Sequence, residues 1–306
     1  MKLLEVARMG LLSFVLGCFS GTGPYNKKDG SWFWKKDRMG VDAKEPLTYL
    51  SEDFATATGS AYFRGDRITN SDGATFQVLN EWLTKDKDRV YYSDTYRKDT
   101  EAWLIKRGRT AEIAGADVST FQALKSRYAR DAKRIYWEGQ PISIHDPASF
   151  EVLESSYARD RTTGYYLQVP VLGSDGATFA SVSDFYAKDA THAWYSGAPD
   201  SSEKYRGVIT NTILADALPA SFVSVDIYYA KDAAHVWYKT SLLKGVDPAT
   251  FETFGSYAKD ATHVIYEGRI LKDGDGASFV WLGAERTPTA DAKDARGEFL
   301  DGKRVK

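Results

Sequence analysis

One twelve-residue phrase recurs along the chain and constrains its fold more than any other feature. It reads YAKDATHVIYEG at Tyr257–Gly268, YAKDATHAWYSG at Tyr186–Gly197 and YAKDAAHVWYKT at Tyr229–Thr240. Its aspartate recurs with gaps of 29, 29, 43 and 28 residues, at Asp131, Asp160, Asp189, Asp232 and Asp260. Self-similarity at such a spacing indicates a tandem repeat whose units stack on their neighbours.

Each copy keeps the same frame around its aspartate. A tyrosine stands three positions before it, a lysine or arginine one position before it, and two large side chains five and six positions after it. A second phrase, such as DGATF, DPATF or DPASF, lies between copies from Asp72 onward. Weaker copies bring the predicted total to about ten units and surround Asp29, Ala57, Asp86, Asp99 and Asp294.

One unit has the composition of a β-hairpin. β-Compatible runs such as ETFGSY and HVIYEG flank the aspartate, and a short polar turn joins them. The aspartate is expected to accept hydrogen bonds from N–H groups two residues on, and the base before it to lie in water. In DPATF the Asp-Pro pair suits the start of a single 3₁₀ turn, and its Phe is expected in the core.

These features predict an all-β protein. Aromatic residues make up 14% of the chain, with 19 Tyr and 8 Trp, and such residues favour strands. We expect tandem β-hairpin repeats with a period of about 29 residues to form an elongated, twisted antiparallel array. A closed, propeller-like ring is the alternative, although WD40 blades need about 40 to 45 residues. Glu298 replaces the first strand residue of the last copy, as in a polar terminal cap.

The N-terminus resembles a bacterial lipoprotein signal. A charged start precedes an apolar run from Met9 to Gly17, and VLGC at Val15–Cys18 is similar to a lipobox. This resemblance implies a membrane-anchored lipoprotein of the bacterial periplasm or cell surface, with membrane contact only through the lipid. The alternative is an amphipathic N-terminal helix docked on the domain, with Cys18 buried. The predicted divisions are a signal peptide over 1–17, lipidation at Cys18, a tether over 18–24 and one repeat domain over 25–306.

The repeat itself resembles that of the DKNYY family. DKDRVYY at Asp86–Tyr92, with KDATHVIY and KDAAHVWY, is similar to the family's pattern of Asp, two polar residues and paired aromatics. The resemblance covers about residues 25–305, and it implies an envelope or secreted bacterial protein with no established catalytic site. Most copies replace the Lys and Asn of the family's motif with Ala and a second small or basic residue, so no functional residue carries over.

No motif in the chain predicts a catalytic, metal or cofactor site. His192, His235 and His263 occupy equivalent turn positions, but hairpin neighbours should lie about 9 to 10 Å apart, too far to share a zinc ion. We interpret Asp273-Gly274-Asp275-Gly276 as a turn rather than a calcium loop, since the other EF-hand ligands are missing. Net charge is -2 and no basic run occurs, which argues against nucleic acid as a partner.

We expect a non-enzymatic protein-binding repeat protein at the bacterial envelope, and specifically an immunity protein that neutralises an antibacterial toxin. Insertions in repeat arrays map to the binding face, and the longest one here spans 198–214 and contains Lys204, Tyr205 and Arg206. A glycan or cell-wall binding module is the first alternative, because paired aromatics could stack on sugars. A hydrolase with an unrecognised site is the second. The oligomeric state is left open.

Overall fold

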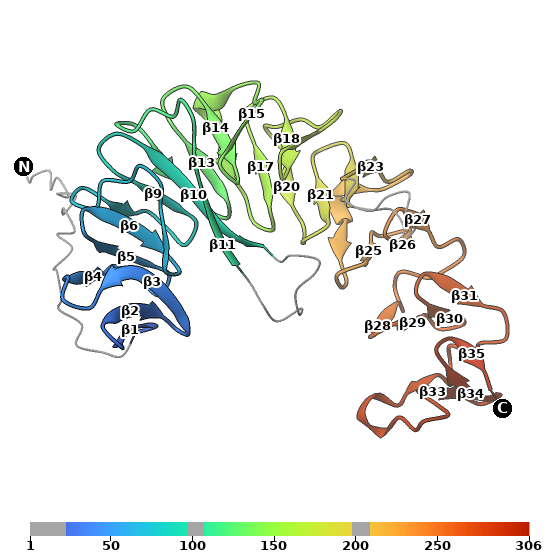
Figure 1. Ribbon diagram of the computed structural model, residues 1–306. Coiled ribbons are helices and arrows are strands. Elements are labelled where there is room, and N and C mark those ends of the chain that lie inside the picture. Colours follow the sequence, from blue (N-terminus) through green and yellow to red (C-terminus); the bar gives the residue numbers. More distant parts are fainter. Residues whose placement is uncertain (1–22, 97–106, 198–208, 306) are drawn as a thin grey trace, which may run out of the picture. The chain divides into compact units, whose positions relative to one another are not determined.

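The computed structural model describes residues 23–96, 107–197 and 209–305, and within them the fold is all-β, as predicted. Short strands form nine separate antiparallel sheets (Figure 1). The chain divides into two compact units, residues 1–114 and 115–306, and the repeat runs through both. Each of these units is described below by itself.

The first unit contains three sheets. They comprise β1 (Tyr25–Lys28), β2 (Ser31–Trp34) and β3 (Asp37–Asp42); β4 (Leu47–Tyr49), β5 (Phe54–Ala57), β6 (Ser60–Phe63) and β7 (Asp66–Arg67); and β8 (Gln77–Val78), β9 (Leu83–Lys85), β10 (Val90–Tyr96) and β11 (Arg107–Glu112).

The second unit contains six sheets of four strands each. The first three comprise β12 (Gln122–Ala123), β13 (Tyr128–Arg130), β14 (Ile135–Trp137) and β15 (Gln140–Ile142); β16 (Glu151–Val152), β17 (Tyr157–Arg159), β18 (Gly164–Tyr166) and β19 (Val169–Val171); and β20 (Ala180–Ser181), β21 (Tyr186–Lys188), β22 (Ala193–Ser196) and β23 (Asn211–Ile213). The last three comprise β24 (Val223–Ser224), β25 (Tyr229–Lys231), β26 (Val236–Tyr238) and β27 (Ser241–Leu242); β28 (Glu252–Phe254), β29 (Tyr257–Lys259), β30 (Val264–Tyr266) and β31 (Arg269–Leu271); and β32 (Val280–Trp281), β33 (Ala292–Asp294), β34 (Gly297–Leu300) and β35 (Lys303–Arg304).

The repeating unit is a four-stranded meander, and the predicted hairpin is its central pair. In the sheet β12–β15, for example, the strands pair in chain order, and β13 and β14 flank Asp131. The predicted hairpin is confirmed, and the structure adds a further strand on each side of it. In the second unit these outer strands are only two or three residues long, so they carry too little alternation to be predicted.

The structure describes nine sheets, against the about ten units predicted from the sequence. The difference is the weak copy around Asp99, a residue that lies outside the described part of the chain. The strands on either side of that copy, β10 and β11, pair with each other over Tyr91–Tyr96.

A buried aspartate connects two turns in each regular unit. Asp160 is 1% exposed, and its Oδ1 accepts the N–H groups of Thr162 and Thr163, each at 2.8 Å. Its Oδ2 accepts the N–H of Asp146, 14 residues earlier, at 2.9 Å. The sequence predicts the first pair of bonds and not the last one. Equivalent bonds to the preceding turn are made by Asp86, Asp131, Asp189, Asp232, Asp260 and Asp294.

The preceding turn also bonds to the aspartate turn, because the hydroxyl of its Ser or Thr accepts a backbone N–H from that turn. Ser149 Oγ accepts the N–H of Arg161 at 2.9 Å, and Thr178 Oγ1 accepts that of Ala190 at 3.1 Å. In two copies this turn is the predicted 3₁₀ turn, as η1 (Pro147–Ser149) and η3 (Pro219–Ser221), and a third 3₁₀ turn, η4 (Gly283–Glu285), lies in the last sheet. The Phe that follows is buried as predicted, for example Phe150 and Phe222.

These hydrogen bonds keep the buried carboxylates ionised. Burial alone would raise the pKa of Asp160, but the hydrogen bonds from the Asp146 N–H and the Thr162 hydroxyl are among those that outweigh it and hold the pKa at about 2. Burial also opposes ionisation of Asp294, where the contact with Arg304 contributes most to lowering the pKa to about 2. Ionisation of these groups is therefore coupled to folding.

Within the second unit, successive sheets pack face to face through large side chains on both faces. Tyr128 and Trp137 of one sheet form a cluster with Phe150, Ala158 and Tyr165 of the next. The aromatic six positions after the aspartate thus points to the following sheet, and the one five positions after it points back. Alanine two positions before the aspartate leaves room for the tyrosine of the preceding sheet, because larger side chains would overfill the contact.

In several units the base before the aspartate also joins neighbouring sheets, so the prediction that it lies in water is wrong for Arg130, Arg159, Lys188 and Lys231. Lys188 Nζ donates to the carbonyl oxygens of Pro219 at 2.9 Å and Phe222 at 3.0 Å, both in the next unit. Lys231 Nζ makes the same contact with Pro248 at 2.8 Å. The base is half-buried because carbonyls at the end of a 3₁₀ turn need donors.

The repeat tyrosine provides a third contact between sheets. Tyr186 Oη donates to the carbonyl of Tyr228 at 2.6 Å, and Tyr229 Oη accepts the N–H of Gly268 at 2.9 Å. Gly268 has a φ of +76°, and a Cβ there would lie 2.3 Å from the ring of Tyr238. Both the backbone conformation and this close approach therefore require the glycine eight positions after the aspartate.

Tyr157 is the exception, because it faces the sheet that carries the long insertion. Its hydroxyl lies near Ser196, yet within the described residues neither side-chain oxygen makes a hydrogen bond. Where β22 and β23 are joined by the insertion, the tight turn that supplies partners to Tyr186 and Tyr229 is missing. A buried hydroxyl without a partner is costly, so this contact is weaker than its counterparts.

Replacing Asp160 with Asn is expected to lower the free energy of unfolding at pH 7 by about 3 kcal/mol, because an amide cannot accept all the donors around it. The folded pKa of about 2 lies below the unfolded value, so this stabilisation is complete above pH 4 and is lost as the pH falls toward 2. Urea unfolding followed by Trp fluorescence should therefore show the variant and the wild type converging between about pH 4 and pH 2.

Asp184→Asn provides the matched control, since Asp184 is exposed and has no ion pair among the described residues. It should change the free energy of unfolding by less than about 0.5 kcal/mol. Equal losses in the two variants would contradict a special role for the buried aspartate.

Tyr157→Phe is expected to leave the free energy of unfolding within about 0.5 kcal/mol of the wild type, because it removes a hydroxyl that has no partner. Tyr186→Phe should cost about 1 kcal/mol, since it removes the buried hydrogen bond from the Tyr186 hydroxyl to the Tyr228 carbonyl, which keeps only the N–H of Lys239 as a donor. Both variants are compared by urea unfolding. A loss in Tyr157→Phe as large as in Tyr186→Phe would show that the insertion-bearing sheet is held like the others.

Candidate functional site

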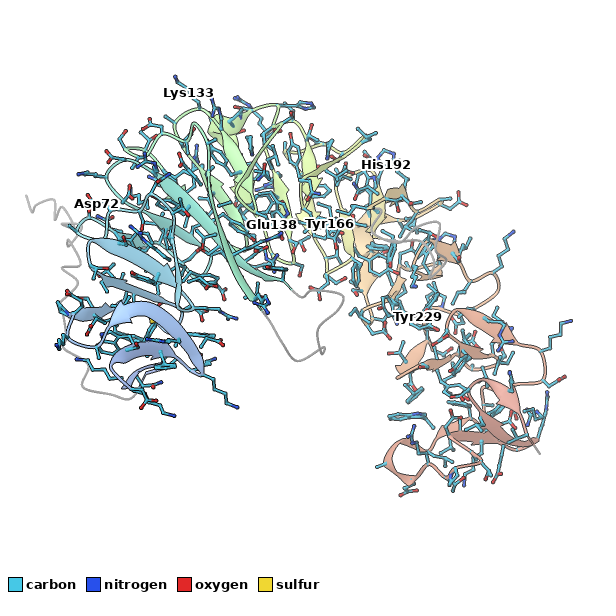
Figure 2. All side chains as sticks on the ribbon, viewed as in Figure 1. Asp72, Lys133, Glu138, Tyr166, His192 and Tyr229 are labelled. Atoms are coloured by element: carbon cyan, nitrogen blue, oxygen red, sulfur yellow. The ribbon has the colours of Figure 1, made fainter. Side chains whose placement is uncertain are left out.

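The meander gives every four-stranded sheet two ends with different contents. One end holds the turns between the first and second strands and between the third and fourth, which we call the insertion end. The other, the aspartate end, holds the turn with the repeat aspartate and the connection to the next sheet. Figure 2 shows Lys133 and Glu138 at opposite ends of the hairpin formed by β13 and β14.

The three long connections between paired strands all occur at the insertion end. Residues 97–106 join β10 to β11, residues 197–210 join β22 to β23, and residues 282–291 join β32 to β33. The other third-to-fourth strand connections are two-residue turns such as Glu138-Gly139. The fold therefore accepts extra chain at this end, where the repeat aspartate makes no contact.

Several predicted site residues lie outside the described residues. These are Cys18, Asp99, Lys204, Tyr205 and Arg206. Of the predicted insertion, residues 209–214 are described, and they contribute β23 and the buried Leu214. The other predicted aspartates, at 86, 131, 160, 189, 232 and 260, are all buried within their turns.

The three turn histidines contact the aspartate of their own unit. His263 Nδ1 lies 2.9 Å from Asp260 Oδ2, whereas the corresponding contacts of His235 and His192 are longer. Units without this histidine carry a tyrosine five positions after the aspartate; Tyr165, for example, donates to Asp160 Oδ2 at 2.8 Å. Within the described residues no group of three His, Cys, Asp or Glu side chains is placed to hold a metal ion.

The paired aromatics of the repeat are part of the core. Trp194 and Tyr195 are 0% and 2% exposed, and Tyr165 and Tyr166 are 1% and 7% exposed. The bare aromatic ladder that motivated the glycan alternative is therefore missing from these sheets. No helix among the described residues is both long and apolar enough to span a membrane.

One aromatic surface does reach solvent, and it lies at the insertion end. Phe185 and Tyr228 stack with ring centroids 5.9 Å apart and an interplanar angle of 17°. Tyr228 is 38% exposed and its neighbour Ile227 is 50% exposed. We define the aromatic patch by its members, which come from two adjacent sheets: Phe185, Ile227, Tyr228, Tyr238 and Lys239. The buried Tyr195 packs against Phe185.

The patch adjoins the insertion. Phe185 lies in the first turn of the sheet β20–β23, and a Cβ on Gly197, at the start of the insertion, would be 3.4 Å from its ring. Exposed aromatics next to an inserted segment are typical of protein-binding surfaces, where Tyr is a frequent anchor. This patch is the best candidate functional site among the described residues.

The patch was not predicted, although the sequence carries a signal for it. The position four before the repeat aspartate is polar in neighbouring units, as Arg127, Ser156 and Ser256, but aromatic in the two units that flank the insertion. A turn position that is exposed in one copy and aromatic in another has no role in the core. Comparing the copies at this position could have located the patch.

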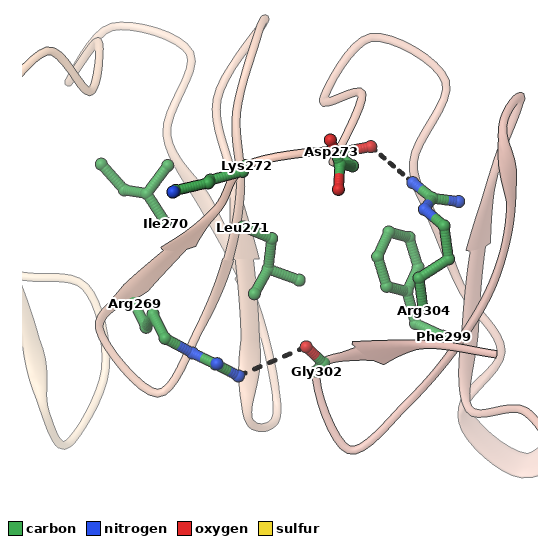
Figure 3. A pocket seen from close by; sticks show the side chains of 8 residues that line it. All are labelled: Arg269, Ile270, Leu271, Lys272, Asp273, Phe299, Gly302 and Arg304. Atoms are coloured by element: carbon green, nitrogen blue, oxygen red, sulfur yellow. Dashed lines mark hydrogen bonds between the residues drawn. The ribbon is translucent and has the colours of Figure 1, made fainter.

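A pocket lies between β31 and β35 in the second unit (Figure 3). Arg304 binds the Asp294 carboxylate at 2.9 Å and donates to the Asp273 carbonyl at 2.5 Å. Arg269 donates to the carbonyl of Gly302 at 3.3 Å. Because both arginines bind partners within the fold, the pocket has a structural role in joining the last two sheets.

Comparison with known proteins supplies the family. The DKNYY family matches residues 12–95 and 96–269, which together are most of the chain. No curated protein matches significantly. No solved structure does so either. The repeated aspartate turn and the family match agree, and the chain belongs to the DKNYY family.

Proposed function

We propose that this chain is a non-enzymatic protein-binding repeat protein that holds its partner at the insertion end of the sheets β20–β23 and β24–β27. The observation that supports this most is the exposed aromatic patch beside the insertion. The patch joins stacked aromatic rings and an exposed isoleucine, and aromatic residues are enriched at the centres of protein interfaces.

The aspartate end of each sheet holds the contacts that stabilise the fold, and the insertion end is where the units vary. At the aspartate end, carboxylates, hydroxyls and bases bond to the repeat's own backbone, so change there costs stability. At the insertion end, the length of the connections and the identity of the side chains differ between units, and these differences leave the hydrogen bonds of the aspartate end unchanged. A binding surface is therefore free to diverge at the insertion end.

The site of action proposed for this protein is the bacterial envelope, with Cys18 as the lipid anchor, and the partner proposed is an antibacterial toxin that the chain neutralises. The lipobox-like Val15–Cys18 supports the anchor. A toxin arriving at the envelope would meet a rigid array of sheets with a prepared binding surface, which limits the entropy lost on binding.

The binding surface is tested by placing a photocrosslinking phenylalanine derivative at position 228 of the full chain in its native cells. We expect a covalent adduct with a protein at that position and none at position 244, where the exposed Lys244 lies at the aspartate end. Purified partner should bind Tyr228→Ala at least about tenfold more weakly than wild type. Equal adducts at both positions, or none at either, would overturn the proposal.

The envelope proposal is tested with Cys18→Ala. The wild-type chain is expected in the membrane fraction and this variant in the soluble fraction, because the variant lacks the thiol that carries the lipid. Cells that produce the wild type should survive a toxin encoded by a neighbouring gene better than cells that produce the variant. Fractionation that is the same for both chains would rule out the anchor, and no protection by the wild type would rule out immunity.

A further inference from the structure

Carboxylates without ion-pair partners surround the aromatic patch. Asp184 precedes Phe185, Asp226 precedes Ile227, and Glu267 lies in the third-to-fourth strand turn of the next sheet. Asp184 and Glu267 are exposed, and Asp226 is half-buried because its Oδ1 accepts the N–H of Tyr228 at 2.8 Å. Within the described residues none of the three forms a salt bridge.

At the insertion end of neighbouring sheets, acidic side chains form salt bridges. Glu154 pairs with Lys125 at 2.9 Å, and Glu138 pairs with Arg127. Both bases lie in the turn between the first and second strands of a sheet. In the two sheets of the patch, this turn contains Phe185 and Tyr228 instead. Around the patch, therefore, the bases are replaced by aromatics and acids, and these acids form no salt bridge among the described residues.

The carboxylates lie close enough to the rings to act on them. The pKa of Tyr238 is raised first by burial and then by the negative charge of Glu267, with Tyr228 and Asp226 adding to it. Asp184 acts in the same direction on Tyr166, again after burial. Acids and phenol rings thus share one surface and one electrostatic field.

The patch already holds one cation from its own chain. Lys239 Nζ lies 5.0 Å from the ring centroid of Tyr228 and 5.5 Å from that of Tyr238. These distances are those of cation–π contacts, which strengthen when the site loses water. One ammonium faces three carboxylates, so the surface has the charge to accept further cations.

We propose that the partner contacts this patch with a Lys- and Arg-rich segment. The segment's cations would pair with Asp184, Asp226 and Glu267, and its aliphatic stems would lie on the exposed side chains of Tyr228 and Ile227. This inference rests on the proposed protein-binding function and adds the chemistry of the partner. Anionic partners such as nucleic acid or acidic lipid would be repelled by the same charges.

The test uses a fluorescein-labelled Lys/Arg-rich peptide and its Asp/Glu counterpart, with binding to the full chain measured by fluorescence anisotropy. The basic peptide should bind, and the acidic one should not. Asp184→Asn combined with Glu267→Gln should raise the Kd of the basic peptide about tenfold, with most of the change lost in high salt. Urea unfolding checks that the double variant is folded.

Glu252→Gln combined with Asp273→Asn is the matched control, because it removes two exposed acids at the aspartate end and changes net charge equally. Its Kd should stay within about twofold of the wild type. Equal weakening in both double variants would overturn the proposal, since total charge rather than the patch would then set the affinity.

The crosslink at position 228 separates this inference from the function on which it rests. If the partner adduct forms equally in wild type and in Asp184→Asn/Glu267→Gln, the protein-binding function stands and the basic segment is ruled out. If no adduct forms in the wild type, the protein-binding function itself fails. Loss of the adduct in the patch variant, with retention in the control variant, supports both.

Discussion

The ionised aspartate buried at one end of each regular sheet is the interaction on which the rest of the structure depends. One carboxylate holds its own turn and the turn that leads into the sheet, 14 residues earlier in most units, and a hydroxyl returns the bond. A buried charge is tolerated only where donors surround it, and here the backbone supplies most of them. The bond between two turns, rather than the hairpin alone, fixes the register of the unit.

Stacking of sheets in the second unit follows from that fixed geometry. Because every unit places its tyrosine, alanine, base and paired aromatics in the same positions, each face meets a complementary face. Most of the repeated contacts engage the aspartate end and the middle of each sheet, and at the insertion end the repeated contact is the bond between the repeat tyrosine and the backbone of the next sheet. This explains why the long connections occur there and why an aromatic patch could arise without loss of the fold.

Much of the unit could be predicted from residues, and the errors have physical reasons. The role of Asp160 in its own turn follows from the short reach of its side chain, and the buried Phe150 follows from the Asp-Pro turn. The base before the aspartate was assigned to water because its partner, the carbonyl of Pro219 in the case of Lys188, is 31 residues away in sequence. The copy around Asp99 has the residues of a unit but lies between two strands that pair with each other.

The sequence by itself determined the repeat, the all-β class and the residues that must recur, since recurrence exposes every position the fold needs to keep. Only the tertiary structure decided which positions meet. It showed that large side chains cover both faces of a sheet, that Tyr or His supplements the aspartate contact, and that Phe185 and Tyr228, 43 residues apart, stack on one surface. The reason is that contacts between units join residues far apart in the chain, and no local pattern records them.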